Sequence, residues 1–389
     1  MPINALKKFV NLESKSSILL LVSALCAVLI ANSPWNLNYE YFINYSLGFS
    51  LPYFQVSTTV KLLVNDGLMT LFFLLISLEV KRSMLIGELN SRKKASLPLI
   101  ASIGGVLGAA LVYLIINYGL ETSIRGWAVP TATDIAFSSA VLLLLGRSVP
   151  KSLRLFLSTL AIIDDVIAII IIALFYSVDF QILFLLLAVF CFIGLLLLNK
   201  LRLVRYELYV VLGMLLWICI EKSHVSPPMA GVLLGISLPL HSKKKDAVSP
   251  LEKFEEMLHP WVSYGILPIF VFVNGGLFLL DTQVSMLFNP ITLGIILGLF
   301  LGKQAGIFTF CRMAVLAKVA KLPDDVSWRQ MYGLSVLGGI GFTMNLFIGF
   351  LAFADSVENL NLVKLGVFSA SILSAIVGYV ILRSTVAKS

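Results

Sequence analysis

The chain has 389 residues, of which 59% are hydrophobic and only 13% are charged, and its mean hydropathy is +0.96. Soluble domains carry roughly 25% charged residues, so this composition excludes a soluble enzyme or binding module and indicates a membrane protein. The net charge of +8 does not indicate nucleic-acid binding, because the basic residues gather in alternate loops between apolar segments.

Twelve apolar segments are long enough to cross the ~30 Å hydrocarbon core of a bilayer as helices. They lie near 16–31, 60–80, 95–116, 124–146, 155–177, 180–199, 206–221, 225–240, 258–280, 291–311, 328–352 and 362–382. The first follows Lys7 and Lys8, as the apolar part of a signal peptide would. No small-residue cleavage site comes after it, so we interpret it as a transmembrane helix.

The basic residues predict the orientation of the chain. Most of the 29 Lys and Arg residues fall in every second loop, such as Lys81 and Arg82 after the second segment and Arg312 after the tenth. Cytoplasmic loops carry such an excess. Both termini are therefore predicted to be cytoplasmic, which requires an even number of spans.

No soluble domain is predicted, so residues 1–389 are interpreted as a single transmembrane transporter domain. Its longest polar stretches are an external loop near 32–58 and a basic cytoplasmic loop near 241–256. The external loop has no Lys or Arg but many aromatic residues, which fits either an aromatic belt at the membrane surface or a small β-hairpin. The four cysteines lack Cys-x-x-Cys spacing, so they indicate neither a disulfide framework nor a metal site. No resident cofactor is expected.

Two predicted spans are interrupted. The fourth contains Pro130 among polar residues, and the eleventh contains Gly338, Gly339 and Gly341. Glycine and proline are common in membrane helices, so either break alone is weak evidence. The two spans lie an odd number of crossings apart and therefore run in opposite directions. Such a pair predicts an inverted-repeat transporter with its site near the membrane midplane.

Four ionisable residues lie deep within predicted spans: Asp134, Asp164, Asp165 and Lys303. An ionised group in hydrocarbon is costly, so each is a candidate functional residue. Counted from the basic residue at the cytoplasmic end of each helix, Asp164 lies about 15 Å deep and Lys303 about 14 Å deep. Asp134 lies about 20 Å deep if its span is helical throughout. All three depths fall in the middle third of the membrane.

Adjacent residues on a helix point about 100° apart, so we expect one of Asp164 and Asp165 to pair with Lys303 and the other to face a water-filled cavity. Carboxylate oxygens suit a hard cation such as Na+ or Li+, and the segments offer no thiolate or imidazole cluster for a transition metal. Coupled acids release protons in steps that belong to the whole cluster. Protons and Na+ that compete for the same oxygens would give antiport. Asp66 and Glu79 lie nearer the ends of the second segment, and both a functional and an interfacial role stay open.

Several motifs, in order from about residue 10 to 383, resemble the NhaA family of bacterial Na+/H+ antiporters. They are Asn65-Asp66-Gly67-Leu68-Met69, Leu78-Glu79-Val80-Lys81-Arg82, Pro130-Thr131-Ala132-Thr133-Asp134-Ile135-Ala136-Phe137, Ala161-Ile162-Ile163-Asp164-Asp165, Leu258-His259-Pro260-Trp261, Gly302-Lys303 and Gly339-Ile340-Gly341-Phe342-Thr343-Met344. This family is itself one of the examples on which the inverted-repeat rule rests, so the two arguments for the fold are not independent.

The resemblance implies an all-α fold of twelve transmembrane helices, built from inverted-topology repeats. The fourth and eleventh helices would cross as broken helices whose partial charges are balanced by Asp134 and Lys303. Asp165 and Asp164 would carry the Na+ and the protons, Thr133 and Asp134 would help to form the site, and Asp164 would pair with Lys303.

The resemblance also implies electrogenic export of Na+ and Li+ for H+, driven by the proton motive force and serving sodium and pH homeostasis. The protein would be a homodimer in the bacterial inner membrane, joined through a β-hairpin in the external loop. Glu79 and Glu255 match acids that are associated with the cytoplasmic mouth and the response to pH. Ser226 stands where relatives can carry histidine, with His224 two residues earlier, so the resemblance does not determine the pH threshold.

Three other functions share parts of the pattern. An intramembrane aspartyl protease also uses two embedded aspartates, but its Tyr-Asp and Gly-x-Gly-Asp signatures are absent from the sequence. A passive cation channel would not need a lysine beside the acids at the midplane. A sodium symporter should carry a pocket for an organic substrate, and no segment suggests one. The sequence therefore favours a secondary antiporter over an enzyme or a channel.

Overall fold

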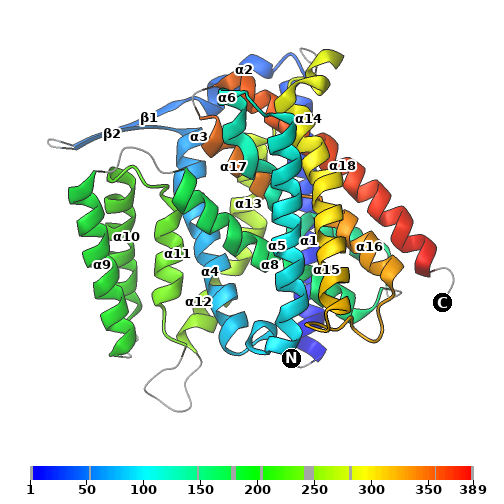
Figure 1. The fold of residues 1–389 in the computed structure, drawn as a ribbon. Helices are drawn as coiled ribbons and strands as arrows, with labels where there is room; N and C mark the ends of the chain where they lie inside the picture. Colours follow the sequence, from blue (N-terminus) through cyan, green and yellow to red (C-terminus); the bar gives the residue numbers. More distant parts are fainter. Residues whose placement is uncertain are drawn as a thin grey trace. The chain divides into compact units, whose positions relative to one another are not determined.

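The structure is a computed structural model that describes residues 3–51, 54–146, 149–176, 181–201, 205–240, 249–279, 283–354 and 356–386. This described part is almost wholly helical, and its only strands form one hairpin (Figure 1). By internal contacts the chain divides into two compact units, each assembled from segments far apart in the sequence. The first comprises Met1–Val22, Glu88–Ala168 and Leu277–Ser389, and the second comprises Ser23–Gly87 and Ile169–Gly276.

Two helices, α1 (Ile3–Ala31) and α8 (Lys151–Phe175), run from one unit into the other. In the labels, α denotes an α-helix and η a 3₁₀- or π-helical segment. The other elements of the first unit are η2 (Glu88–Asn90), α5 (Arg92–Ile116), α6 (Glu121–Ile124), η3 (Arg125–Thr131), α7 (Ile135–Leu144), η6 (Val284–Phe288), α14 (Pro290–Leu297), η7 (Gly298–Lys303), α15 (Gln304–Leu316), α16 (Trp328–Leu337), α17 (Phe342–Ala352) and α18 (Val357–Val386).

The second unit holds the hairpin and the remaining helices. Its elements are α2 (Asn36–Ile43), β1 (Ser46–Leu51), β2 (Phe54–Thr59), α3 (Val60–Leu62), η1 (Leu63–Leu68), α4 (Met69–Leu85), α9 (Ile182–Lys200), α10 (Tyr206–Lys222), α11 (Pro228–Ser237), α12 (Pro250–Trp261), η5 (Val262–Ile266) and α13 (Leu267–Asn274).

The fold is the predicted all-α polytopic one. Seven helices in the described part are long and apolar enough to cross a membrane, and the number rises to ten if each of three bent helix pairs counts as one span. The seventh and eighth predicted segments contain α10 and α11, which are shorter. The total of twelve spans, and the interpretation of the chain as one transporter domain, stay predictions.

The external loop near 32–58 contains a β-hairpin. Strands β1 and β2 pair antiparallel with Ser46 opposite Thr59 and Leu51 opposite Phe54, and residues 52–53 between them lie outside the described part. Of the two interpretations that the aromatic composition allowed, the backbone adopts the hairpin.

The basic loop predicted near 241–256 ends earlier than expected. Residues 241–248 lie outside the described part, and α12 already begins at Pro250. The Ser249 side chain accepts a hydrogen bond from Glu252 N, and proline is well suited to the first helical position, where its missing N–H costs nothing. The apolar segment predicted near 258–280 does not include this start, because the first turns of α12 mix acidic, basic and apolar residues.

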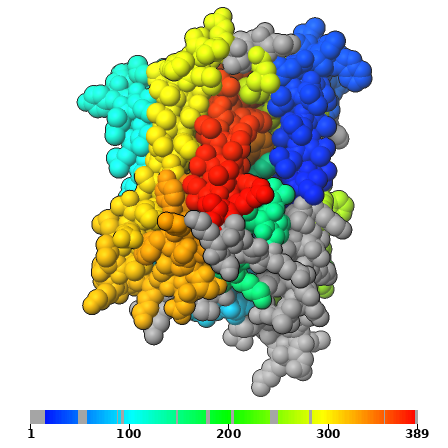
Figure 2. Space-filling view, turned by 90° about the vertical axis from the view of Figure 1, so that its right-hand side faces the viewer, coloured from blue at the N-terminus to red at the C-terminus, as the bar shows by residue number. Residues whose placement is uncertain are grey.

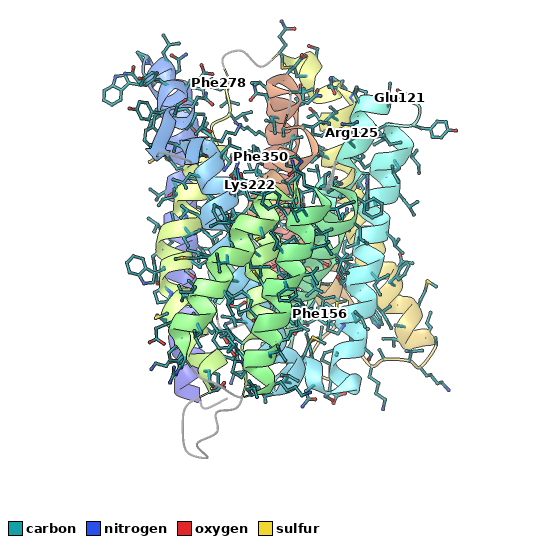
Figure 3. All side chains as sticks on the ribbon, turned by 90° about the vertical axis from the view of Figure 1, so that its left-hand side faces the viewer. Glu121, Arg125, Phe156, Lys222, Phe278 and Phe350 are labelled. Atoms are coloured by element: carbon teal, nitrogen blue, oxygen red, sulfur yellow. The ribbon has the colours of Figure 1, made fainter. Side chains whose placement is uncertain are left out.

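Both interrupted spans are broken where the sequence predicted. The first bends by 47° between η3 and α7, and the second by 43° between α16 and α17. In Figure 3, Glu121 and Arg125, at the start of the first of these spans, lie near one end of the first unit, and Phe156, in the first turns of α8, lies well away from that end. The chain therefore crosses this unit between Arg125 and α8.

The glycines of the second break allow close backbone approach. A Cβ added to Gly341 would lie 2.8 Å from Ala132 O, and one added to Gly339 would lie 2.6 Å from Leu299 O. Among the described glycines only Gly119 and Gly146 have a positive φ, so left-handed backbone is not the reason for glycine at the break. A side chain at Gly341 would push the two breaks apart, and one at Gly339 would push the second break away from η7.

A second close approach holds α5 against η7 and α15. A Cβ on Gly108 would collide with Gly302 O, and a Cβ on Gly306 would collide with Gly104 O. Small residues spaced four apart let membrane helices pack backbone to backbone in this way. The segment that carries Lys303 is therefore fixed tightly against α5.

The surface of the first unit is apolar where lipid is expected. Figure 2 shows α18 (red) beside α14 (yellow), and these two helices pack against each other. Along α18 the side chains of Ile372, Leu373, Ile376 and Val380 are exposed. A surface of this kind, on helices that satisfy their own backbone hydrogen bonds, suits hydrocarbon rather than water.

Candidate functional site

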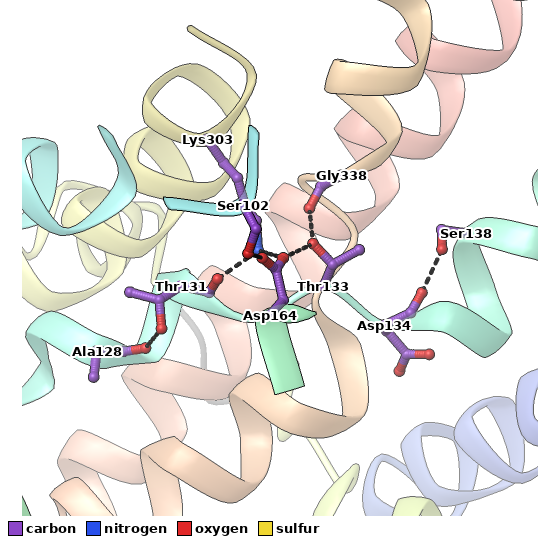
Figure 4. Close-up of polar contacts among 9 residues, drawn as sticks. All are labelled: Ser102, Ala128, Thr131, Thr133, Asp134, Ser138, Asp164, Lys303 and Gly338. Atoms are coloured by element: carbon purple, nitrogen blue, oxygen red, sulfur yellow. Dashed lines mark hydrogen bonds and ion pairs between the residues drawn. The ribbon is translucent and has the colours of Figure 1, made fainter. Parts of the chain in front are cut away.

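The centre of the site is Asp164, in the middle of α8. Lys303 Nζ lies 2.8 Å from Asp164 Oδ2, and both side chains are 0% exposed. Thr133 Oγ1 lies 2.6 Å from the same oxygen, and Ser102 Oγ donates to the other oxygen, Oδ1 (Figure 4). Four segments of the first unit thus converge on one buried carboxylate: α5, the chain between η3 and α7, α8 and η7.

Lys303 also closes the end of a helical segment. Its Nζ lies 2.5 Å from Thr131 O, at the last residue of η3. Carbonyl groups at a helix C-terminus carry partial negative charge, which an ammonium group stabilises. Lys303 itself ends the π-helical segment η7, and π-helical turns within helices are frequent at functional sites.

Asp134 performs the opposite task at two helix N-termini. Its Oδ1 accepts hydrogen bonds from Ala136 N at 3.0 Å and Phe137 N at 3.1 Å, at the start of α7. Its Oδ2 accepts from Thr343 N at 2.8 Å and Thr343 Oγ1 at 2.5 Å, at the start of α17. One carboxylate therefore balances the partial positive charge of both helix starts. Because the Asp134 carboxylate already accepts four hydrogen bonds, it is less available to a transported cation than a carboxylate with fewer donors.

The backbones of the two breaks are also linked directly. Asp134 N donates to Ile340 O at 2.7 Å. With the amide of Asn345 oriented to satisfy its hydrogen bonds, its nitrogen lies 3.0 Å from Val129 O and 3.2 Å from Ala132 O. Carbonyl groups that the first break releases thus find a donor on α17, as unwound backbone inside a membrane requires.

Asp165 lies beside Asp164 on α8 and is also buried, at 7% exposed. Since successive helical residues point about 100° apart, the two carboxylates leave the helix in different directions. Pro130 lies inside η3, and Gly338, Gly339 and Gly341 form the break between α16 and α17. The first unit therefore contains every residue that the sequence predicted for the ion site and the breaks.

The residues predicted for the pH response belong to the second unit. Glu255, on α12, accepts a 2.7 Å hydrogen bond from Arg82 Nε and forms an ion pair with it. Glu79 lies on α4, the helix that carries Arg82. Ser226 is buried just before α11, and the backbone of His224 has a φ of 62°.

Sequence reasoning missed three residues of the site: Ser102, Thr343 and Asn345. Ser102 and Asn345 are polar residues within apolar segments, which was an available signal. Thr343 was quoted only as part of a motif. Without the fold, nothing separates these side chains from the many serines and threonines that bond to their own helix, as Ser335 does to Met331 O.

A helical membrane protein in which two broken helices meet around a buried carboxylate, balanced by a buried lysine, belongs to the class of secondary ion transporters. The sequence model of the family described as Na+/H+ antiporter 1 matches residues 7–382. The chain belongs to this family, and it is accordingly a secondary transporter and not an enzyme.

Curated relatives agree over the full length. The Na+/H+ antiporter NhaA 1 of Syntrophotalea carbinolica is 46% identical over 388 residues, which cover 100% of this chain and 98% of the relative. NhaA 2 of Campylobacter jejuni strain 81-176 is 44% identical, covering 97% of this chain and 98% of the relative. NhaA of Proteus mirabilis is also 44% identical, covering 98% and 97%. The resemblance that the motifs carried is confirmed, and the chain is a multi-pass protein of the bacterial inner membrane.

Proposed function

We propose that this chain exports Na+ in exchange for H+ and that both compete for Asp164 and Asp165. The observation that supports this most is the buried ion pair between Asp164 and Lys303. A buried pair of charges is a poor device for stability, since apolar residues of the same volume serve as well or better. Its presence at the meeting point of two broken helices is therefore better explained by ion exchange.

The exchange follows from charge balance. A Na+ ion that binds to the carboxylates replaces the ammonium group of Lys303 as the countercharge of Asp164. Carboxylate, hydroxyl and carbonyl oxygens are suitable ligands for a hard monovalent cation, and Thr133 and Gly338 add such oxygens beside Asp164. Protons that bind to the same carboxylates expel the cation. Asp134 contributes its charge from the helix N-termini.

The same site accounts for the finer properties that we propose. Li+ is a hard cation with the same preference for oxygen, so it is a second substrate. Two adjacent carboxylates can take two protons in place of one monovalent cation, which makes the exchange electrogenic, and no resident cofactor is required. Because protons compete with Na+, transport falls as the cytoplasm becomes acidic. Glu79 and Glu255 are the candidates for a further pH response, and the cell uses the exchange for sodium and pH homeostasis.

Two features of the assembly complete the proposal. Both termini face the cytoplasm, as the basic loops indicate. The protein is a homodimer, and the hairpin of β1 and β2 contributes to the contact between its subunits.

The test is a pH-gradient assay in proteoliposomes, to which Na+, Li+ or K+ is added in turn. Na+ and Li+ should dissipate an acid-inside gradient, and K+ should not. The rate should rise when K+ and valinomycin collapse the membrane potential, because net charge then moves freely. If none of the cations dissipates the gradient, the antiport proposal is wrong, and if the potential has no influence, the exchange is electroneutral.

A further inference from the structure

The two oxygens of Asp164 are held in different ways. Oδ2 receives two donors, Lys303 Nζ at 2.8 Å and Thr133 Oγ1 at 2.6 Å. Oδ1 receives the hydroxyl of Ser102, on α5. In Figure 4 these donors reach the carboxylate from separate segments.

Both donors on Oδ2 have a second acceptor within reach. Lys303 Nζ lies 2.5 Å from Thr131 O, and Thr133 Oγ1 lies 2.9 Å from Gly338 O. A threonine hydroxyl has a single hydrogen, so it can donate to only one of its two acceptors at a time. Thr133 can turn this hydrogen to Gly338 O and still be satisfied. Both donors can thus release Oδ2 to a cation and still keep a hydrogen-bond acceptor of their own, which matters because an unsatisfied donor in the membrane interior is costly.

Ser102 differs from the two donors on Oδ2. Its side chain is 0% exposed, and within the described part of the chain its hydroxyl forms no hydrogen bond other than the one to Asp164. It lies on the face of α5 that also carries Gly105, where a Cβ would come within 3.5 Å of Lys303 Cγ. Oδ1 is thus held by a donor that has no second acceptor in place among the described residues, so it is the more firmly held oxygen.

We propose that Ser102 is a positioning residue of the exchange site, which fixes Oδ1 of Asp164 so that Oδ2 is the oxygen passed between Lys303 and the transported cation. The proposal rests on Na+/H+ exchange at Asp164, and it assigns to a residue outside the recognised motifs the task of orienting the carboxylate. Thr133, with its hydrogen on Gly338 O, then turns an oxygen lone pair towards the cation.

Loss of the Ser102 hydroxyl should act on cation binding more than on turnover. The terminal torsion of an aspartate is soft, so a carboxylate without this anchor can rotate and offer both oxygens to Lys303. A cation must then displace the lysine from a mobile group and order that group as it binds. This cost raises the KM for Na+, whereas the later steps of the cycle keep their rate.

The experiment compares Ser102→Ala with Ser102→Thr in proteoliposomes, at an alkaline pH where KM no longer changes with pH. Ser102→Ala should raise the KM for Na+ about tenfold, at the lower end of the range expected for one hydrogen bond to a charged group, with a maximal rate within about twofold of the wild type. Ser102→Thr keeps the hydroxyl and should restore KM. The matched control is Ser237→Ala, a buried serine of the second unit whose hydroxyl bonds to its own helix at Leu234 O.

A second readout is the rise of the unfolding temperature with Na+, which should need a higher Na+ concentration in Ser102→Ala. An unchanged KM, or a loss of maximal rate at unchanged KM, would overturn the proposal. If Ser102→Thr does not fold, Ser102→Cys replaces it, and its weak donor should give a KM between those of serine and alanine. A wild-type protein without Na+-dependent exchange would refute the proposed function itself, which is a different outcome.

Discussion

At the scale of single residues, the site depends on two neighbouring carboxylates with different surroundings. Asp164 is held by Ser102, Thr133 and Lys303. Asp165 leaves the same helix about 100° away, whereas the ammonium group of Lys303 contacts Oδ2 of Asp164 at 2.8 Å. We therefore expect Asp165 to be the first ligand of the cation, and Asp164 to join it when the lysine withdraws.

Asp165→Asn should abolish Na+-dependent exchange and leave the protein folded. An amide keeps the size of the carboxyl group but removes the negative charge that binds Na+ and accepts a proton. Exchange is measured in proteoliposomes, and folding by gel filtration and thermal unfolding in detergent. Thr159→Val, on the same helix, is the control, because the Thr159 hydroxyl bonds only to Leu155 O among the described residues. Retained exchange in Asp165→Asn would refute the role that we assign to this residue.

Lys303→Met should destabilise the protein and stop exchange. The substitution leaves the Asp164 carboxylate buried without a countercharge, and breaking such a pair costs about 3–5 kcal/mol. The double variant Lys303→Met with Asp164→Asn should recover most of the stability, because a neutral amide needs no countercharge, but should not recover transport. The measurement is the unfolding temperature of the purified proteins at neutral pH. A single variant as stable as the wild type would argue against a buried ion pair.

At the scale of elements, the site depends on backbones that touch. The breaks meet through Asp134 N and Ile340 O, and α5 touches η7 and α15 through four glycines: Gly104, Gly108, Gly302 and Gly306. Helices that pack this closely hold the ends of the broken helices within reach of single side chains. The geometry of the polar site therefore depends on the glycine contacts between α5, η7 and α15.

Gly306→Ala should lower both stability and Na+ affinity. Its Cβ would meet the backbone of Gly104, so α15 must move away from α5 and carry Lys303 with it. We expect a lower unfolding temperature and a raised KM for Na+. Gly265→Ala is the matched control, because a Cβ there has no neighbour within 4 Å, and alanine favours the helix more than glycine does. Equal behaviour of the two variants would show that the contact between α5 and α15 is not tight.

At the scale of the whole molecule, each compact unit is assembled from distant parts of the chain. The first gathers the two broken spans, α8 and η7, and with them the ion site. The second gathers the hairpin, α4 and α12, and with them Glu79, Arg82 and Glu255. The residues proposed for exchange and those proposed for the response to pH therefore belong to different units.

Deletion of Ser46–Thr59, replaced by a short flexible linker, should convert the proposed dimer to a monomer. The ion site lies in the first unit, whereas the hairpin belongs to the second, so Na+-dependent exchange should persist. The mass of the protein in detergent, measured by light scattering after gel filtration, distinguishes the two states. A deletion variant that is still dimeric would exclude the hairpin as the main contact, and a monomeric wild type would exclude the dimer.

The sequence by itself determined the class of fold, the two breaks and the charged residues of the site. Apolar length and charge in a membrane protein are governed by the bilayer, which acts on each segment separately. Asp134, Asp164, Asp165 and Lys303 could therefore be recognised one at a time, without knowledge of their neighbours. The start of α12 escaped the same reasoning because its amphipathic first turns are not apolar enough.

Only the tertiary structure decided which atoms meet. It paired Asp164 with Lys303, assigned Asp134 to the starts of two helices, and brought Ser102 and Asn345 to the site. The physical reason is that a hydrogen bond depends on differences of tenths of an ångström in the distance between its two atoms, and Asp134 and Thr343, which form one, lie 209 residues apart in the sequence. Hydropathy and helical period contain no information at that resolution.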